Sequence, residues 1–359
     1  MPLRVASVGA GYFAAFQLAA WQRMDGVTLT GIAEPDAARR ADAAQRYGCP
    51  VWDQAATMVA KIRPDILDIA TPPASHAALI RAGLDARVGA IVCQKPFALD
   101  LATARALTAE ADAQATPLIV HENFRFQPWY REAAALIGSG RLGALCQARF
   151  HLRPGDGSGA DAYLDRQPYF RTMPRFLIHE TGIHFIDVFR YLLGEPTAIY
   201  ADLRRINPVI VGEDAGLVIF DFGAGCRAVF DGNRTLDHAA RNHRRTLGEL
   251  EVEGSAATLR LDGDGGLHLR PRGAAAWQAH GYEWMDRDFG GDCVQRFQEH
   301  VRDGLAGRRP LETQASAYLR NLEIEAAIYR SAAEGAKLPL GPAGVERGVE
   351  GCGTGGGDG

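Results

Sequence analysis

The chain lacks the features that mark several classes of protein. Its six cysteines are scattered with no Cys-x-x-Cys pair, which argues against both a disulfide framework and a zinc signature. No apolar run approaches the roughly 18 residues of a membrane span. The formal net charge of −4 gives no basic excess for nucleic acid or an anionic membrane. We therefore expect a cytoplasmic protein with reduced thiols, and neither a membrane nor a nucleic acid as partner.

What is present is an ordinary globular composition. With 359 residues and 47% hydrophobic side chains, the chain can build about two domains with full cores. The first part alternates short apolar runs with Ala-rich helical patterns, which predicts a parallel sheet covered on both faces. The expected strands are Leu3–Val8, Val27–Ala33, Ile66–Ala70, Val88–Cys93 and Leu118–His121.

The pattern changes after residue 121. Helical spacing over 176–193 is followed by stretches of period-two alternation, which predict strands with one buried face in an open, largely antiparallel or mixed sheet. We predict an α/β protein with a Rossmann dinucleotide-binding domain at 1–121. A second α/β domain, for substrate binding and oligomerisation, is expected at 122–340. The Gly-rich residues 341–359 are expected to be a disordered tail.

A glycine-rich turn lies between the first expected strand and helix. In Gly9-x-Gly11-x-x-Ala14, Gly9 permits the tight turn, Gly11 lets the backbone approach a pyrophosphate, and Ala14 allows close packing of helix on strand. Tyr12 and Phe13 fill the turn, and the helix N-terminus adds amide donors. The context predicts a dinucleotide site.

An acidic residue follows at the end of the second expected strand. Glu34 can accept hydrogen bonds from the adenosine ribose hydroxyls and would repel a 2′-phosphate, which favours NAD. Arg39 and Arg40 lie one helical turn further on and leave NADP open. Their alternative interpretation is a solvated helix face.

Other candidates lie at the carboxyl ends of expected strands, where ligands bind in such sheets. Thr71 and Pro72 end one strand, with His76 inside the next helix, although a rigid turn with a capping histidine explains them as well. Lys95 follows another strand, where a lysine can donate to a substrate oxygen or contact the nicotinamide ribose. Gln94 precedes it. The expected cofactor contacts are Gly9, Gly11, Tyr12, Phe13, Glu34, Thr71, Pro72, His76, Gln94 and Lys95.

A carboxylate and an imidazole lie four residues apart in the helical stretch 176–193. Glu180, His184 and Asp187 share one face of an α-helix. Histidine is the usual general base near neutral pH, and a carboxylate can orient its ring. Structural polar packing and a metal site are the alternatives. No further ligand appears at metal-binding spacing, so we expect no metal.

Taken in order, these motifs resemble the Gfo/Idh/MocA oxidoreductases, the relatives of glucose–fructose oxidoreductase and inositol dehydrogenase. The similarity runs from Arg4 to about Leu340. It rests on Gly-Ala-Gly-Tyr-Phe-Ala at 9–14, Ala-Thr-Pro-Pro-Ala-Ser-His at 70–76, Gln-Lys-Pro at 94–96, Asn-Phe-Arg-Phe at 123–126 and His-Phe-Ile-Asp at 184–187.

The resemblance implies an NAD(P)-dependent oxidoreductase acting on the CH–OH group of a sugar, cyclitol or related polyol. It also implies a homodimer or homotetramer formed through the second sheet. The family's Glu-Lys-Pro lysine falls on Lys95, and its helical Asp-x-x-x-His falls on Glu180 and His184, with the histidine as general base. Two positions depart from the family pattern, because Gln94 and Glu180 stand where the family has glutamate and aspartate.

The expected mechanism is a reversible hydride transfer assisted by Lys95, Glu180 and His184. The expected substrate contacts are Asn123, Arg125, Arg166, Gln167, Tyr169 and His184. Two other functions stay open at this point. One is NAD-dependent glycoside hydrolysis with transient oxidation, and the other is a non-catalytic regulator that binds dinucleotide.

Overall fold

The computed structural model describes residues 2–342. All but the first two residues of the expected Gly-rich tail at 341–359 lie outside the described residues. Within 2–342, no helix is long and apolar enough to cross a membrane. The five cysteines of this range are unpaired thiols.

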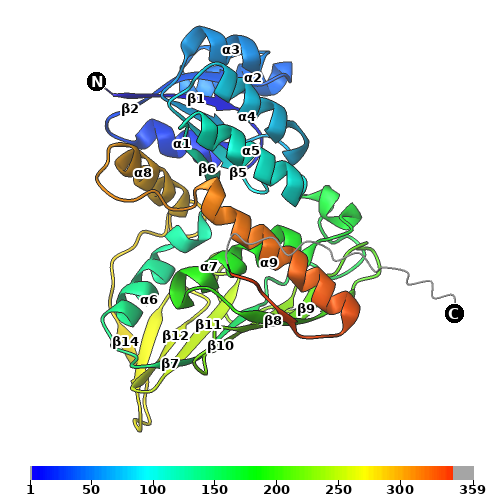
Figure 1. The fold of residues 1–359 in the computed structure, drawn as a ribbon, viewed down its shortest axis with the longest axis vertical. Coiled ribbons are helices and arrows are strands. Elements are labelled where there is room, and N and C mark those ends of the chain that lie inside the picture. The colour runs from blue at the N-terminus through cyan, green and yellow to red at the C-terminus, as the bar shows by residue number, and fades with distance from the viewer. Residues whose placement is uncertain (1, 343–359) are drawn as a thin grey trace, which may run out of the picture.

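The first domain is a six-stranded parallel sheet in the order β3-β2-β1-β4-β5-β6, with helices on both faces (Figure 1). Its central strands are buried on both faces, since every residue of β4 and all but the last residue of β5 are enclosed. This confirms the Rossmann prediction. The strands are β1 (Leu3–Val8), β2 (Val27–Ala33), β3 (Val51–Trp52), β4 (Ile66–Ile69), β5 (Ala90–Gln94) and β6 (Leu118–His121). The helices are α1 (Ala14–Arg23), α2 (Ala37–Tyr47), α3 (Ala55–Ile62), α4 (His76–Asp85) and α5 (Leu101–Ala113).

The second domain is built on a nine-stranded sheet in the order β14-β13-β12-β11-β7-β10-β9-β8-β15. Its strands alternate between buried and accessible residues, as the sequence predicted. The sheet is mixed because β7 and β10 run parallel while the other pairs are antiparallel. The strands are β7 (Leu145–Leu152), β8 (Ala198–Arg204), β9 (Ala215–Asp221), β10 (Arg227–Asn233), β11 (Gly248–Gly254), β12 (Ala257–Leu261), β13 (Leu267–Pro271), β14 (Gln278–His280) and β15 (Leu338–Pro339).

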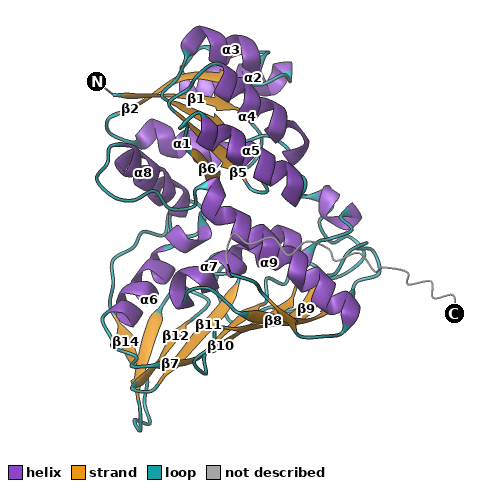
Figure 2. Ribbon diagram, viewed as in Figure 1, coloured by secondary structure: helices purple, strands orange, loops and turns teal. Residues whose placement is uncertain are grey.

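Helices cover one face of this sheet, between it and the Rossmann domain (Figure 2). They are α6 (Pro128–Gly138), the π-helical turn η4 (Leu177–Gly182) with α7 (Ile183–Leu193), and α9 (Ala315–Glu334). Aromatic rings join helix and sheet, since Phe185 on α7 stacks on Phe150 of β7 at 3.9 Å between ring centroids. Oligomerisation through the opposite face stays a prediction.

One late helix returns to the Rossmann domain. Helix α8 (Cys293–Leu305) packs on α1, and its Val294, Phe297 and Val301 join the apolar core beneath β1, β4, β5 and β6. The chain therefore crosses between the domains more than once. The short 3₁₀ turns η1 (Pro73–Ser75), η2 (Phe124–Phe126) and η3 (Pro168–Thr172) complete the connections.

Candidate active site

A cavity of about 800 Å³ opens between the two domains. Its walls come from the glycine turn, the carboxyl ends of β4 and β5, the segment after β6, and η4. Most of the expected site residues meet there, although they are spread over more than 170 positions of the sequence. Those in the wall are Tyr12, Phe13, Thr71, Pro72, Gln94, Lys95, Asn123, Arg166, Gln167, Tyr169, Glu180 and His184.

The glycine turn has the geometry that a dinucleotide requires. Gly9 has φ +104°, and a Cβ there would lie 2.6 Å from the Ala70 carbonyl oxygen. A Cβ on Gly11 would meet nothing within 4 Å, so that side of the turn is open for a pyrophosphate to approach. Gln94 adds a buried Nε2 at the cavity wall without a hydrogen-bond partner in residues 2–342. These features fit NAD.

Glu34 is buried beside the same turn. Its carboxylate accepts hydrogen bonds from the main-chain N–H of Ala10 at 2.9 Å and from Arg39 at 3.0 Å. Burial alone would raise the pKa of Glu34, but the bonds from Arg39 and the backbone lower it overall. An ionised carboxylate therefore lies beside the glycine turn, and Arg39 is already engaged by it.

His184 is paired with a carboxylate that the sequence analysis did not select. Its Nδ1 lies 2.7 and 2.9 Å from the two carboxylate oxygens of Glu122, just after β6. The ring of Phe124 stacks on the imidazole at 3.9 Å, nearly parallel. Tyr318 donates to the same carboxylate at 3.2 Å. Burial would raise the pKa of Glu122, but the charge and hydrogen bond of His184 and the main-chain N–H of Phe124 lower it overall.

This pairing fixes the role of each ring nitrogen. With Nδ1–H donated to Glu122, Nε2 of His184 keeps its lone pair, and no residue of 2–342 hydrogen-bonds to it. His184 lines the cavity while Glu122 is fully buried behind it. A buried carboxylate that orients an imidazole is the usual support of a general base.

The expectation that Glu180 holds His184 is therefore wrong. Lys95 Nζ donates to the Glu180 carbonyl oxygen and, at 3.2 Å, to its carboxylate. Thr181 donates its hydroxyl to the other carboxylate oxygen at 2.6 Å. Burial would raise the pKa of Glu180, but the charges of Lys95 and Arg234 lower it to about 2. Glu180 is thus a permanent anion that positions Lys95.

The reason lies in the local helix geometry. The main-chain N–H of Ile183 donates to the carbonyl of Ile178, five residues back, so η4 is wider than an α-helix. The α-helical rule that residues four apart share a face does not apply across this turn. Glu213 supports the turn, because its carboxylate accepts from the main-chain N–H groups of Phe176 and Ile178 at 3.1 Å each.

A buried arginine extends the charge network. Arg234, at the end of β10, donates to Thr181 at 2.7 Å and to Asp156 at 2.8 Å, and lies 3.7 Å from Glu180. Arg166 reaches the same Asp156 at 3.4 Å. Cations and carboxylates therefore alternate along this part of the cavity wall, which offers both hydrogen-bond donors and acceptors.

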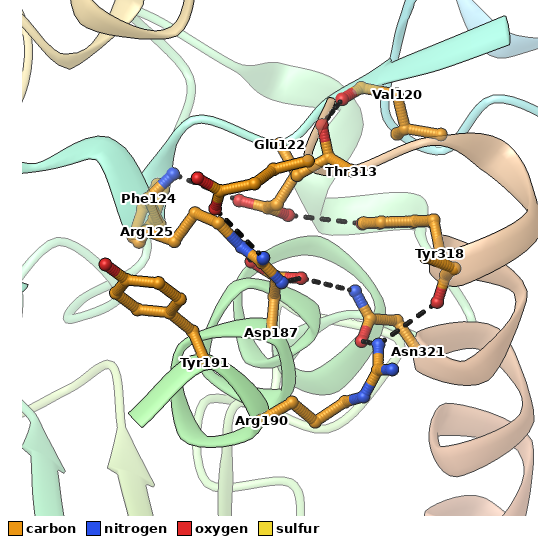
Figure 3. Close-up of polar contacts among 12 residues, drawn as sticks. Val120, Glu122, Phe124, Arg125, Asp187, Arg190, Tyr191, Thr313, Tyr318 and Asn321 are labelled. Carbon is orange, nitrogen blue, oxygen red and sulfur yellow. Dashed lines mark hydrogen bonds and ion pairs between the residues drawn. The ribbon is translucent and has the colours of Figure 1, made fainter. Parts of the chain in front are cut away.

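Five expected site residues do not line the cavity. Gly9, Gly11 and Glu34 lie at the glycine turn described above, and the other two are Arg125 and His76. Arg125 donates to both carboxylate oxygens of Asp187 at 2.7 and 2.6 Å (Figure 3). It also pairs with Glu312. Asn321 on α9 donates to Asp187 as well. Arg125 is therefore held between α7 and α9, and the expectation of a substrate contact is corrected. His76 is fully buried, with its ring nitrogens 2.7 and 2.9 Å from two loop carbonyls, so it braces the cavity loops instead.

Sequence reasoning missed Glu122, Asp156 and Arg234. Glu122 carried the same signal as Lys95, since it directly follows a strand of the parallel sheet. Asp156 and Arg234 gave no such signal, because Asp156 lies in an irregular loop and Arg234 directly follows β10 of the mixed sheet.

Comparison with known proteins identifies the family of this chain. The model of an oxidoreductase family with an NAD-binding Rossmann fold, GFO_IDH_MocA, matches residues 3–122. The model of the GFO/IDH/MocA C-terminal domain matches residues 130–260. This chain belongs to that family. The predictions of an oxidoreductase and of an NAD-binding domain are thereby confirmed.

Relatives of known name cover most of the chain. A D-apiose dehydrogenase from Paraburkholderia graminis is 32% identical over 93% of this chain and 89% of its own. An inositol 2-dehydrogenase from Rhizobium meliloti is 29% identical over 72% and 75%. Among solved structures, an oxidoreductase from Agrobacterium radiobacter in complex with NAD+, L-tartaric acid and magnesium has a TM-score of 0.85. It is 28% identical over 94% of this chain and 98% of its own.

Proposed function

We propose that this GFO/IDH/MocA protein oxidises a secondary or hemiacetal CH–OH group of a sugar, cyclitol or related polyol. The observation that carries the proposal is the His184–Glu122 pair, with a free Nε2 in the wall of the cavity that Lys95 also lines. The names of the relatives, an apiose dehydrogenase and an inositol dehydrogenase, support the same substrate class.

Each side chain has a distinct part in the proposed reaction. His184 accepts the hydroxyl proton at Nε2, and Glu122 stabilises the resulting imidazolium. Lys95, held by Glu180, donates a hydrogen bond to the substrate oxygen as negative charge develops there. NAD, when bound, supplies the acceptor for the hydride that leaves the carbinol carbon. Asn123, Arg166, Gln167 and Tyr169 are proposed to bind the remainder of the substrate.

The proposed cofactor contacts also rest on positions in the cavity wall. Tyr12, Phe13, Thr71, Pro72 and Gln94 line the cavity next to the glycine turn. The ionised Glu34 supports a preference for NAD over NADP, because it would repel a 2′-phosphate.

The test is a panel of polyols, aldoses and cyclitols, offered with NAD and with NADP in parallel. Absorbance of the reduced nicotinamide gives the rate. We expect turnover with NAD, and about a 100-fold or larger loss of kcat in His184→Asn. His268→Asn is the matched control, since His268 pairs with Asp262 at 2.8 Å outside the cavity wall. Sugar release from a glycoside without net reduced cofactor would instead establish the hydrolase.

A further inference from the structure

His179 is a titratable side chain in the cavity wall that the proposed reaction does not use. It lies in η4, five residues before His184, and borders the same cavity. Its Nδ1 lies 2.7 Å from Oε1 of Glu325 on α9. The His179 side chain is 28% exposed and that of Glu325 only 8%. The wall therefore carries a second imidazole with a buried carboxylate behind it.

The π-helical turn is what brings the two histidines to one wall. In an α-helix, at 3.6 residues per turn, residues five apart point roughly 140° away from each other. The wider turn, closed by the bond from Ile183 to Ile178, reduces this difference. Such turns are frequent at functional sites. One inserted residue thus places His179 and His184 beside the same ligand space.

The backbone and ring of His179 are both fixed. Its main-chain N–H donates to the Tyr329 hydroxyl at 3.1 Å, and that hydroxyl donates to Glu213 at 2.6 Å. With Nδ1 directed at Glu325, the ring presents Nε2, and no residue of 2–342 hydrogen-bonds to it. A rigid imidazole of this kind is a well-oriented hydrogen-bond acceptor.

We propose that Nε2 of His179 accepts a hydrogen bond from a second hydroxyl of the substrate, on a carbon other than the one oxidised. This inference rests on the proposed function and adds the residue that binds a non-reacting hydroxyl of the polyol. His184 serves the reacting hydroxyl, and His179 fixes the molecule relative to it. A site built to bind a hydroxyl discriminates against an analogue lacking it, because its polar group is then left unpaired.

The test compares the best substrate of the panel with its monodeoxy analogues, each lacking one non-reacting hydroxyl. The wild-type chain should lose about tenfold or more in kcat/KM with one of these analogues. His179→Gln should lose a similar factor on the parent substrate, mainly through KM, and lose little more on that analogue. His280→Gln is the matched control, because His280 pairs with Glu132 at 2.7 Å outside the cavity wall.

The outcomes separate this inference from the proposed function. If His179→Gln discriminates against every deoxy analogue as strongly as the wild type, His179 binds no hydroxyl and only this inference fails. If the wild type oxidises no polyol, both fail. Glu325→Gln is a second variant that keeps the proposal testable if His179→Gln does not fold. It keeps the imidazole of His179 but removes its carboxylate partner. Glu325→Gln should lose part of the discrimination against the deoxy analogue. If folded Glu325→Gln and folded His179→Gln both discriminate as fully as the wild type, the proposal is overturned.

Discussion

The π-helical turn η4 and the α-helix α7 are consecutive parts of one helix, but their titratable side chains lie in different environments. In η4, His179 and Glu180 border the cavity and remain partly exposed. In α7, Asp187 is 1% exposed and is held by Arg125 and Asn321. His184 stands at the junction, with one nitrogen toward a buried carboxylate and the other unpaired.

The difference shows where this helix performs chemistry and where it supports the fold. Regular α-helical spacing in α7 places Ile186, Val188 and Phe189 in the core, and its one acid is neutralised by a bidentate arginine. The irregular turn directs polar groups into the ligand space instead. Three variants test this division, and we order them by the expected loss of turnover.

Glu122→Gln should cause the largest loss. The amide removes the negative charge that stabilises a protonated His184 and disturbs the acceptors used by the imidazole and Tyr318. We expect kcat to fall about 100- to 1,000-fold, in the range of general acid–base catalysis. Steady-state kinetics measures this, with circular dichroism and NAD titration to confirm a folded, cofactor-binding protein. Glu132→Gln is the control, because Glu132 pairs with the imidazole of His280 outside the cavity wall, and this variant should keep full activity.

The Rossmann half shows what the sequence can predict well. Uninterrupted apolar strands, a glycine turn and strand-end residues depend on local chain geometry, so β1, β2 and β6 appear at their expected positions. The strands of the second domain were predicted equally well, because apolar and polar residues alternate along them. The parallel pairing of β7 with β10 was not predicted, since strand pairing depends on contacts between residues that are far apart in the sequence.

Glu180→Gln should have an intermediate effect. It leaves Lys95 and Arg234 without a shared anion, so Lys95 loses its position rather than its charge. We expect kcat/KM to fall about tenfold, as for loss of one charge-assisted hydrogen bond. A larger loss in kcat for Glu180→Gln than for Glu122→Gln would restore the pairing that the sequence suggested.

The pH dependence of stability provides a second measurement on the same variant. The pKa of Glu180 is lowered from 4.5 to about 2 in the folded protein, so its ionisation stabilises the fold above about pH 4.5. The unfolding free energy of wild type relative to Glu180→Gln should be constant from pH 7 to 5. It should then decrease as the pH falls below 4.5. A difference that grows on acidification would contradict the assigned direction.

The site was predictable only where its residues follow a local rule. Lys95 was found because it ends a parallel strand, and His184 because it lies in a helical pattern. The predicted partner of His184, Glu180, was wrong because one extra residue in η4 rotates the Glu180 side chain relative to His184. The α-helical spacing rule cannot reveal such an insertion. Arg125 was predicted to contact substrate because the sequence does not show that it pairs with Asp187, which is 62 positions away.

Arg125→Met should have the smallest effect on turnover and a clear effect on stability. Removing the guanidinium leaves Asp187 charged and buried, which we expect to lower the unfolding free energy by about 3 kcal/mol. Since Arg125 lies outside the cavity wall, kcat/KM of the folded variant should stay within about threefold of wild type. Urea unfolding measures the first quantity. Arg204→Met is the control, because its pair with Asp202 is exposed and its loss should leave the unfolding free energy nearly unchanged. A tenfold fall in kcat/KM with unchanged unfolding would instead place Arg125 at the substrate, and the α-helical part of this helix would then share the chemistry of the π-helical turn.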